Sequence, residues 1–122
     1  MNDDTFRDHM ENPWHCGVLH NATVFGSLRN PTCGDEVTLY LKVDGDVIVE
    51  AWHQARGCLL CKASASILCE HVDKMRITDA KMISHDKMIS LTGISITPGR
   101  TGCCLLPLQS LTKLIDPFYQ NE

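Results

Sequence analysis

The chain has 122 residues, which fits a single domain (1–122), and its 43% hydrophobic content is enough for a packed core without disulfide bonds. Its formal net charge of −4 argues against a nucleic-acid partner, because nucleic-acid-binding surfaces depend on clustered lysine and arginine. No apolar run approaches the roughly 20 residues that cross a bilayer, and the acidic start is unlike a secretory signal, so we expect a cytoplasmic protein without a membrane partner.

The first half of the chain predicts a short helix followed by three strands. Residues 5–11 are typical of a helix, and residues 22–28 of an edge-like strand. Residues 36–43 alternate apolar and polar side chains with period two, which predicts a strand with one buried face. Asp44-Gly45 is a strong signal for a tight hairpin turn, so residues 47–56 should return as the partner strand.

The second half predicts helices only. Apolar side chains recur at helical spacing from residue 58 to about residue 75. Two short helices should follow, over residues 78–84 and 86–91. A Gly-rich loop over residues 93–102 should lead to a final helix from residue 103 or 104 to residue 117. Pro107 is expected in the first turn of the final helix, where a missing N–H costs little, and Pro117 at its end. Grouped strands followed by grouped helices predict an α+β domain, an antiparallel three-stranded sheet with helices packed on it.

Cysteine is the informative residue type, with seven copies and no signal peptide to suggest disulfide bonds. Three cysteines fall at junctions between predicted elements: Cys33 in the turn before the hairpin, Cys58 and Cys103 at predicted helix N-termini. Helix N-termini favour the thiolate, which is the form that binds metal or attacks sulfur. These three positions are therefore candidate metal ligands or nucleophiles.

Asp35 follows Cys33 by two residues, and Gly34 between them permits a bend that would direct both side chains at one ion. Three soft thiolates and one hard carboxylate form a mixed ligand set, unlike the thiolate and imidazole sets of closed structural zinc sites. The carboxylate is the weak member of this set. We therefore expect a bound species that leaves or reacts, rather than a purely structural zinc whose removal would unfold the domain.

The remaining cysteines have plainer interpretations. Cys69 is expected to be a buried small residue inside the long helix, and Cys16 a free thiol in a loop. Cys58 and Cys61 form a C-x-x-C pair, which also describes a thioredoxin-type redox site, although that fold requires a preceding βαβ unit instead of a hairpin. Cys104 should point away from Cys103 on the helix. Cys61 and Cys104 are thus additional thiols near the candidate site, which take sulfur, substitute as ligands or are incidental.

Four segments carry a family resemblance. Residues 8–13 read D-H-M-E-N-P, residues 30–35 N-P-T-C-G-D, residues 57–66 G-C-L-L-C-K-A-S-A-S and residues 100–103 R-T-G-C. In this order and at these spacings they resemble the IscU/SufU scaffold family, which is related to the N-terminal domain of NifU. The resemblance extends over nearly the whole chain and implies a SufE/NifU-like α+β fold.

The resemblance also implies a function and its residues. In such scaffolds Cys33, Asp35, Cys58 and Cys103 would hold a transient [2Fe–2S] cluster, built with sulfur from a cysteine desulfurase and passed to apo iron–sulfur acceptor proteins. In SufU-type members the matched residues hold Zn²⁺, and the protein is a zinc-dependent sulfurtransferase that accepts persulfide sulfur. For that alternative Cys103 is the candidate sulfur acceptor.

This chain departs from both branches of the family. IscU proteins carry histidine immediately before the third cysteine, where this chain has Gly102. Residues 96–100 read I-T-P-G-R in place of the L-P-P-V-K motif, which argues against recognition by an Hsp70-type chaperone. SufU proteins usually have an insertion between the second and third cysteines, which this chain lacks. The motifs therefore favour SufU and the length favours IscU.

Overall fold

The computed structural model describes residues 3–31 and 34–120, so the predicted ligand Cys33 lies outside the described residues. The elements follow one another as α1 (Asp3–Glu11), β1 (Val24–Arg29), β2 (Glu36–Asp44), β3 (Val47–Arg56), α2 (Leu59–Val72), α3 (Ile77–Lys81), α4 (His85–Thr92), the 3₁₀ turn η1 (Pro98–Arg100) and α5 (Thr101–Gln120). The predicted α+β arrangement is confirmed.

The three strands form one antiparallel sheet in the order β1-β2-β3. Val37, Leu39 and Leu41 of β2 are at most 1% exposed, while the residues between them are half-buried. This is the period-two pattern read from the sequence, since successive strand residues point to opposite faces. The buried face of the sheet therefore forms one side of the core.

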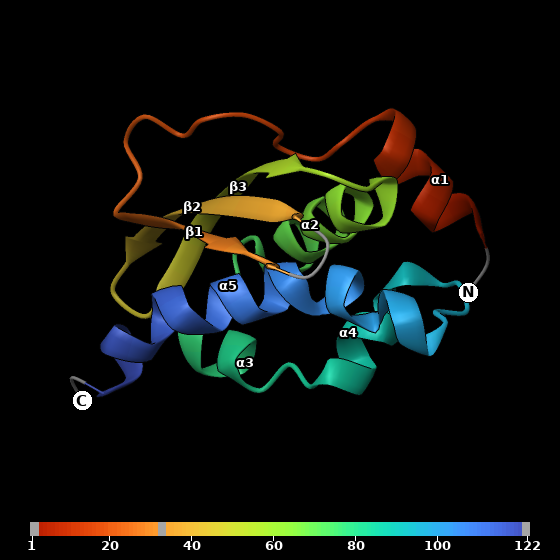
Figure 1. Cartoon of the computed structure of the whole chain (residues 1–122). Helices are drawn as coiled ribbons and strands as arrows, with labels where there is room; N and C mark the ends of the chain where they lie inside the picture. The colour runs from red at the N-terminus through yellow and green to blue at the C-terminus, as the bar shows by residue number, and fades with distance from the viewer. Residues whose placement is uncertain (1–2, 32–33, 121–122) are drawn as a thin grey trace.

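Helices cover that face of the sheet. In Figure 1, α5 runs along the sheet beneath β1 and β2, and α2 packs on β3. The short helices α3 and α4 lie on the far side of α5, and α1 packs against α2. A few buried large side chains fill the space between sheet and helices: Leu39, Leu41, Ile48, Leu68, Met88, Leu111 and Ile115.

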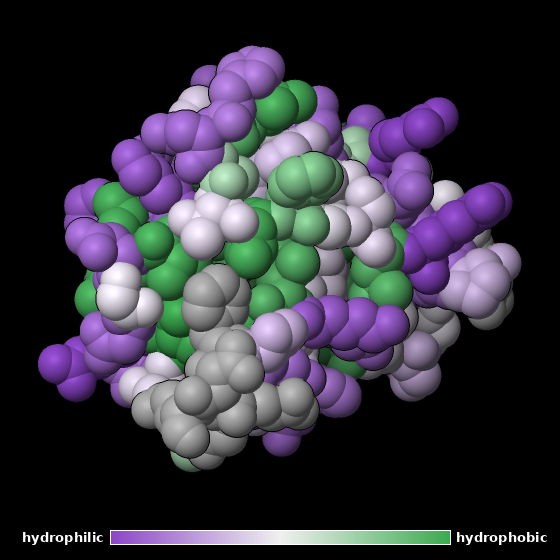
Figure 2. Space-filling model, turned by 90° about the vertical axis from the view of Figure 1, so that its left-hand side faces the viewer, coloured by the Kyte–Doolittle hydropathy of each residue, from purple (hydrophilic) through white to green (hydrophobic). Residues whose placement is uncertain are grey.

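Apolar side chains also reach the surface. Figure 2 shows one end of the molecule, where apolar surface is bordered by hydrophilic side chains. Over the whole described chain, the exposed large hydrophobic residues are Met10, Val18, Phe25, Leu59 and Met82. Within the described residues, no helix combines the length and the apolarity needed to cross a bilayer.

The predicted helix boundaries are partly wrong. The final helix begins at Thr101, because η1 runs directly into it and Pro98 pre-sets the first helical φ angle. Pro107 consequently lies inside α5, beyond its first turn, and α5 continues past Pro117. Helix α2 ends at Val72, three residues before the predicted end, where Lys74 adopts a left-handed conformation with φ of 68°.

Candidate metal centre

Three of the four predicted ligands meet at one end of the sheet. Asp35 immediately precedes β2, Cys58 is the N-cap residue of α2, and Cys103 lies in the first turn of α5. One ligand atom from each, the carboxylate oxygen of Asp35 and the two sulfurs, lie within 4.8 Å of one another. Ligands about 2.3 Å from a tetrahedral ion lie about 3.8 Å apart, so these three atoms would have to close by up to about 1 Å around a single metal.

The ligand atoms sit at the edge of the core. Asp35 is 2% exposed and Cys103 6% exposed, whereas Cys58 is half-buried. The sequence predicts Cys103 at the junction of a loop and a helix. In the structure Cys103 lies within α5, and its side chain belongs to the hydrophobic core. Cys58 is therefore the more accessible of the two thiols.

Asp35 organises the N-terminus of α2. Its Oδ1 accepts a hydrogen bond from the backbone N–H of Cys58 at 3.0 Å, and its Oδ2 accepts one from the Cys58 thiol at 3.3 Å. The Cys58 sulfur in turn accepts the backbone N–H of Cys61 at 3.4 Å, as an N-cap side chain does. These hydrogen bonds hold the Asp35 carboxylate and the Cys58 thiol in contact.

Two glycines permit this approach. Gly34 has φ of +78°, a left-handed conformation that glycine adopts without strain. Gly57 has φ of +120°, and a Cβ built there would lie 2.0 Å from Asp35 Oδ1 and 3.0 Å from Asp35 Cα. Only glycine fits this position, because any side chain would occupy the space of the Asp35 carboxylate.

Arg100 is a site residue that the sequence reading did not single out. Hydrogen bonds to the side chains of Cys58 and then Cys103, with the Coulombic attraction of both, raise the pKa of its guanidinium. Arg100 itself is exposed, at the C-terminal end of η1. It brings a fixed positive charge to the two sulfurs, and its spacing of three residues before Cys103 was the available signal.

The additional thiols lie inside the core. Cys61 and Cys104 are each 0% exposed, and burial raises the pKa of the Cys104 thiol. The thioredoxin-type interpretation of Cys58 and Cys61 lacks its fold, since an antiparallel sheet precedes α2. Cys69 is 1% exposed, as predicted for a small core residue, and Cys16 is exposed. Neither joins the group of Asp35, Cys58 and Cys103.

Comparisons with known proteins agree with this architecture. The chain is 32% identical over 123 residues to the zinc-dependent sulfurtransferase SufU of Bacillus subtilis, covering 87% of this chain and 83% of that protein. It is 30% identical over 122 residues to the iron–sulfur cluster assembly scaffold protein IscU 1 of Archaeoglobus fulgidus, covering all of this chain and 79% of that protein.

A solved structure and a family model complete the comparison. The crystal structure of the SUF-system protein FiSufU from Fervidobacterium islandicum AW-1 superposes with a TM-score of 0.75 at 25% identity, covering 93% of this chain and 95% of that one. The model of the NifU-like N terminal domain matches residues 1–120. The chain therefore belongs to the NifU-like N-terminal domain family, to which its resemblance to IscU and SufU pointed.

Proposed function

We propose that this protein is an iron–sulfur cluster assembly scaffold, which builds a labile [2Fe–2S] cluster on Cys33, Asp35, Cys58 and Cys103 and passes it to apo-proteins. The observation that supports this most directly is the convergence of Asp35, Cys58 and Cys103 within 4.8 Å. The cluster is cargo here. A cysteine desulfurase would supply its sulfur, and the relatives named as scaffolds support this class of function.

Each residue has a role in holding and releasing the cargo. Cys58 and Cys103 supply soft sulfur ligands from rigid elements, which suits iron–sulfide. Asp35 supplies a hard oxygen, which binds iron–sulfide more weakly and favours release. Arg100 places a positive charge beside both sulfurs and would partly offset the negative charge that a thiolate-bound cluster brings.

A SufU-type sulfurtransferase is the second candidate, favoured by the 32% identity to SufU of B. subtilis. Zn²⁺ would then be held by the same residues and would keep the thiols deprotonated. The Cys103 thiolate would attack the outer sulfur of the desulfurase persulfide, whose S–S bond breaks as the desulfurase thiolate leaves. Because Cys103 is only 6% exposed and the Arg100 guanidinium lies beside its sulfur, we expect Arg100 to move before Cys103 accepts sulfur.

The first experiment measures metal and acid-labile sulfide, with a visible spectrum, on protein purified anaerobically and again after incubation with iron, cysteine and a desulfurase. A scaffold should gain iron, sulfide and charge-transfer absorption, and should lose them to an apo-ferredoxin. Cys58→Ser should prevent this gain, whereas Cys16→Ser, which alters an exposed cysteine outside the centre, should not.

The alternative outcome is equally distinct. One zinc that iron does not displace, together with stimulated desulfurase turnover, would replace the scaffold by the sulfurtransferase. In that case Cys103→Ser should abolish transfer of labelled sulfur to the chain. Normal transfer to the variant would remove Cys103 as the acceptor.

A further inference from the structure

A second pair of soft donor side chains lies outside the metal centre. Cys16 and His53 form an isolated parallel β-bridge, in which the Gly17 N–H donates to the His53 carbonyl at 2.8 Å and the His53 N–H to the His15 carbonyl at 3.1 Å. Residues paired in this way project their side chains to the same side of the sheet. The Cys16 thiol and the His53 imidazole are therefore neighbours, fixed by backbone hydrogen bonds.

The His53 ring is held in one tautomer. Its Nε2–H donates to the Trp14 carbonyl at 2.8 Å, and the residue is 2% exposed. Burial lowers the pKa of His53 to about 4, and the nearby His9 and His15 contribute to the decrease, so the ring is neutral at pH 7. Its Nδ1 therefore carries a lone pair, and this buried atom has no hydrogen-bond partner among the described residues.

This arrangement is that of a metal ligand. A metal-binding histidine usually donates its other ring N–H to a carbonyl or carboxylate, which fixes the orientation of the ring. An ordinary core histidine would have both ring nitrogens satisfied. The Nδ1 lone pair of His53 is thus available to a metal ion, and Cys16 lies across the bridge from it.

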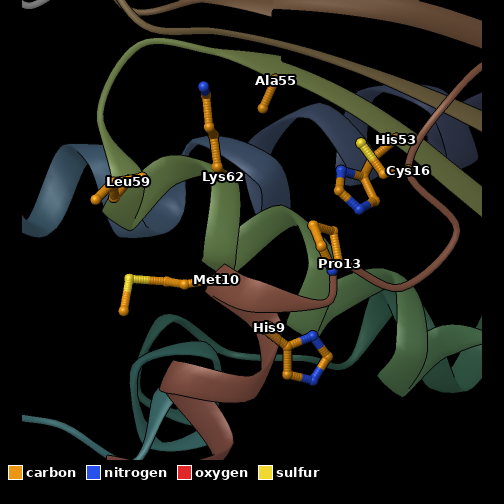
Figure 3. A pocket seen from close by; sticks show the side chains of 8 residues that line it. All are labelled: His9, Met10, Pro13, Cys16, His53, Ala55, Leu59 and Lys62. Carbon is orange, nitrogen blue, oxygen red and sulfur yellow. The ribbon is translucent and has the colours of Figure 1, made fainter.

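The pair opens into a cavity of about 320 Å³ between α1, β3 and the start of α2. Figure 3 shows the His53 ring and Cys16 on one side of this cavity, with Ala55 and Lys62 across from them and Pro13 below. Cys16 is exposed, so an ion can reach the pair through the thiol without opening the core. The wall is mainly apolar apart from His9, His53 and Lys62.

We propose that Cys16 and His53 form a binding site for a soft monovalent d¹⁰ cation of the Cu(I) class, separate from the Asp35–Cys58–Cys103 centre. Thiolate and imidazole are donors that suit Cu(I), and two donors suffice for a linear ion of this kind. On binding, the Cys16 S–H bond breaks and its proton goes to solvent, while S–metal and Nδ1–metal bonds form. No oxidation state changes.

The net charge of the complex favours a monovalent ion over a divalent one. A thiolate and a monovalent cation give a neutral complex, which an apolar wall and the neighbouring Lys62 tolerate. Zn²⁺ would leave a net positive charge at the same place, and it prefers three or four protein ligands where only two are offered. The proposal does not depend on the function assigned to the metal centre.

The test uses Ag(I) as the probe, added stepwise to the full-length protein under anaerobic conditions. Alkylation of each cysteine by iodoacetamide is followed by peptide mass spectrometry, so Cys16 is read separately from the thiols of the centre. Ag(I) should slow Cys16 alkylation, and His53→Gln should raise the Ag(I) concentration required by about tenfold or more. The glutamine side chain can still donate to the Trp14 carbonyl but has no imidazole lone pair.

His20→Gln, at an exposed loop position, is the matched control and should leave the Ag(I) dependence unchanged. If Ag(I) protects Cys16 equally well in His53→Gln and in the wild-type chain, Ag(I) binds the thiol alone and the proposed site is wrong. If His53→Gln does not fold, ¹⁵N NMR of the wild-type chain decides. Ag(I) should shift the His53 Nδ1 resonance and leave Nε2–H in place, and an unmoved Nδ1 resonance would equally overturn the proposal.

Discussion

Asp35 contacts the predicted ligand Cys58 and is itself a predicted ligand. Its two oxygens accept hydrogen bonds from the Cys58 N–H and the Cys58 thiol. If it also weakens cluster retention, Asp35→Ala should lengthen the lifetime of a reconstituted cluster several-fold, because the hard ligand is gone.

Cluster lifetime is measured by the decay of visible absorption in the presence of an apo acceptor. Asp35→Asn is the control, since its amide oxygen can still accept the Cys58 N–H but the carboxylate charge is absent. An unchanged lifetime in Asp35→Ala would show that Asp35 only orders the N-terminus of α2 and does not set the lability of the cluster.

Gly57 makes a second residue-level prediction. Gly57→Ala would place a Cβ 2.0 Å from Asp35 Oδ1 at a φ of +120°, so the carboxylate must leave the site. We expect a loss of about 1–3 kcal/mol in the free energy of unfolding, together with much weaker zinc or cluster binding. Chemical denaturation and metal titration measure the two effects.

Gly99→Ala is the matched control, because nothing lies within 4 Å of a Cβ built at that position. Zinc binding by Gly57→Ala at the wild-type affinity would mean that the Asp35 carboxylate is dispensable.

The sequence could predict Asp35, Cys58 and Cys103 as candidate ligands because they fall at element boundaries. It could not predict the clash at Gly57 or the reach of Arg100, since both depend on contacts between distant segments.

At the scale of elements, Ser66 fastens α1 to α2. The Ser66 hydroxyl accepts the Trp14 N–H at 2.7 Å and lies 2.6 Å from His9 Nδ1, while His9 Nε2 lies 3.1 Å from Glu70 Oε1. The serine is 0% exposed. This network holds α1 and the following loop against the second half of α2.

Ser66→Ala should therefore lower the free energy of unfolding by about 1–3 kcal/mol, because it leaves buried polar groups of Trp14 and His9 without their partner. Urea denaturation gives the value, and amide hydrogen exchange should show faster opening of α1. Ser95→Ala, at an exposed position, serves as the control. A wild-type stability for Ser66→Ala would mean that the network contributes nothing to the docking of α1.

The existence of the strands was easier to predict than the ends of the helices. Strand β2 is predictable because its apolar and polar residues alternate, and the Asp44-Gly45 turn fixes its register with β3. Helix α5 begins two or three residues before the predicted start, because η1 runs directly into it. Pro107 is buried inside the helix, where packing outweighs its low helix propensity.

At the scale of the whole molecule, a buried neutral histidine makes stability depend on pH. His53 has a pKa of about 4 in the folded chain, lowered chiefly by burial, against 6.5 for the free side chain. Between these values the unfolded chain binds the extra proton, so this contribution to stability is complete above pH 6.5 and is lost as the pH falls from 6.5 to about 4. The loss is about 3 kcal/mol for this group.

Urea denaturation of chelator-treated protein across this range measures the loss. His20→Gln should retain the wild-type pH dependence, whereas His53→Gln should flatten it, provided that the variant folds at pH 7. A pH-independent free energy of unfolding across this range would contradict the assignment of His53 as a buried neutral side chain.

The three described candidate ligands come from the residue before β2, the cap of α2 and the first turn of α5, so no local segment contains the described part of the site. During synthesis, Asp35 and Cys58 leave the ribosome well before Cys103, and α5 needs most of its length to pack on the sheet. A nascent chain therefore cannot bring these three side chains together before Cys103 has left the ribosome and α5 has packed on the sheet.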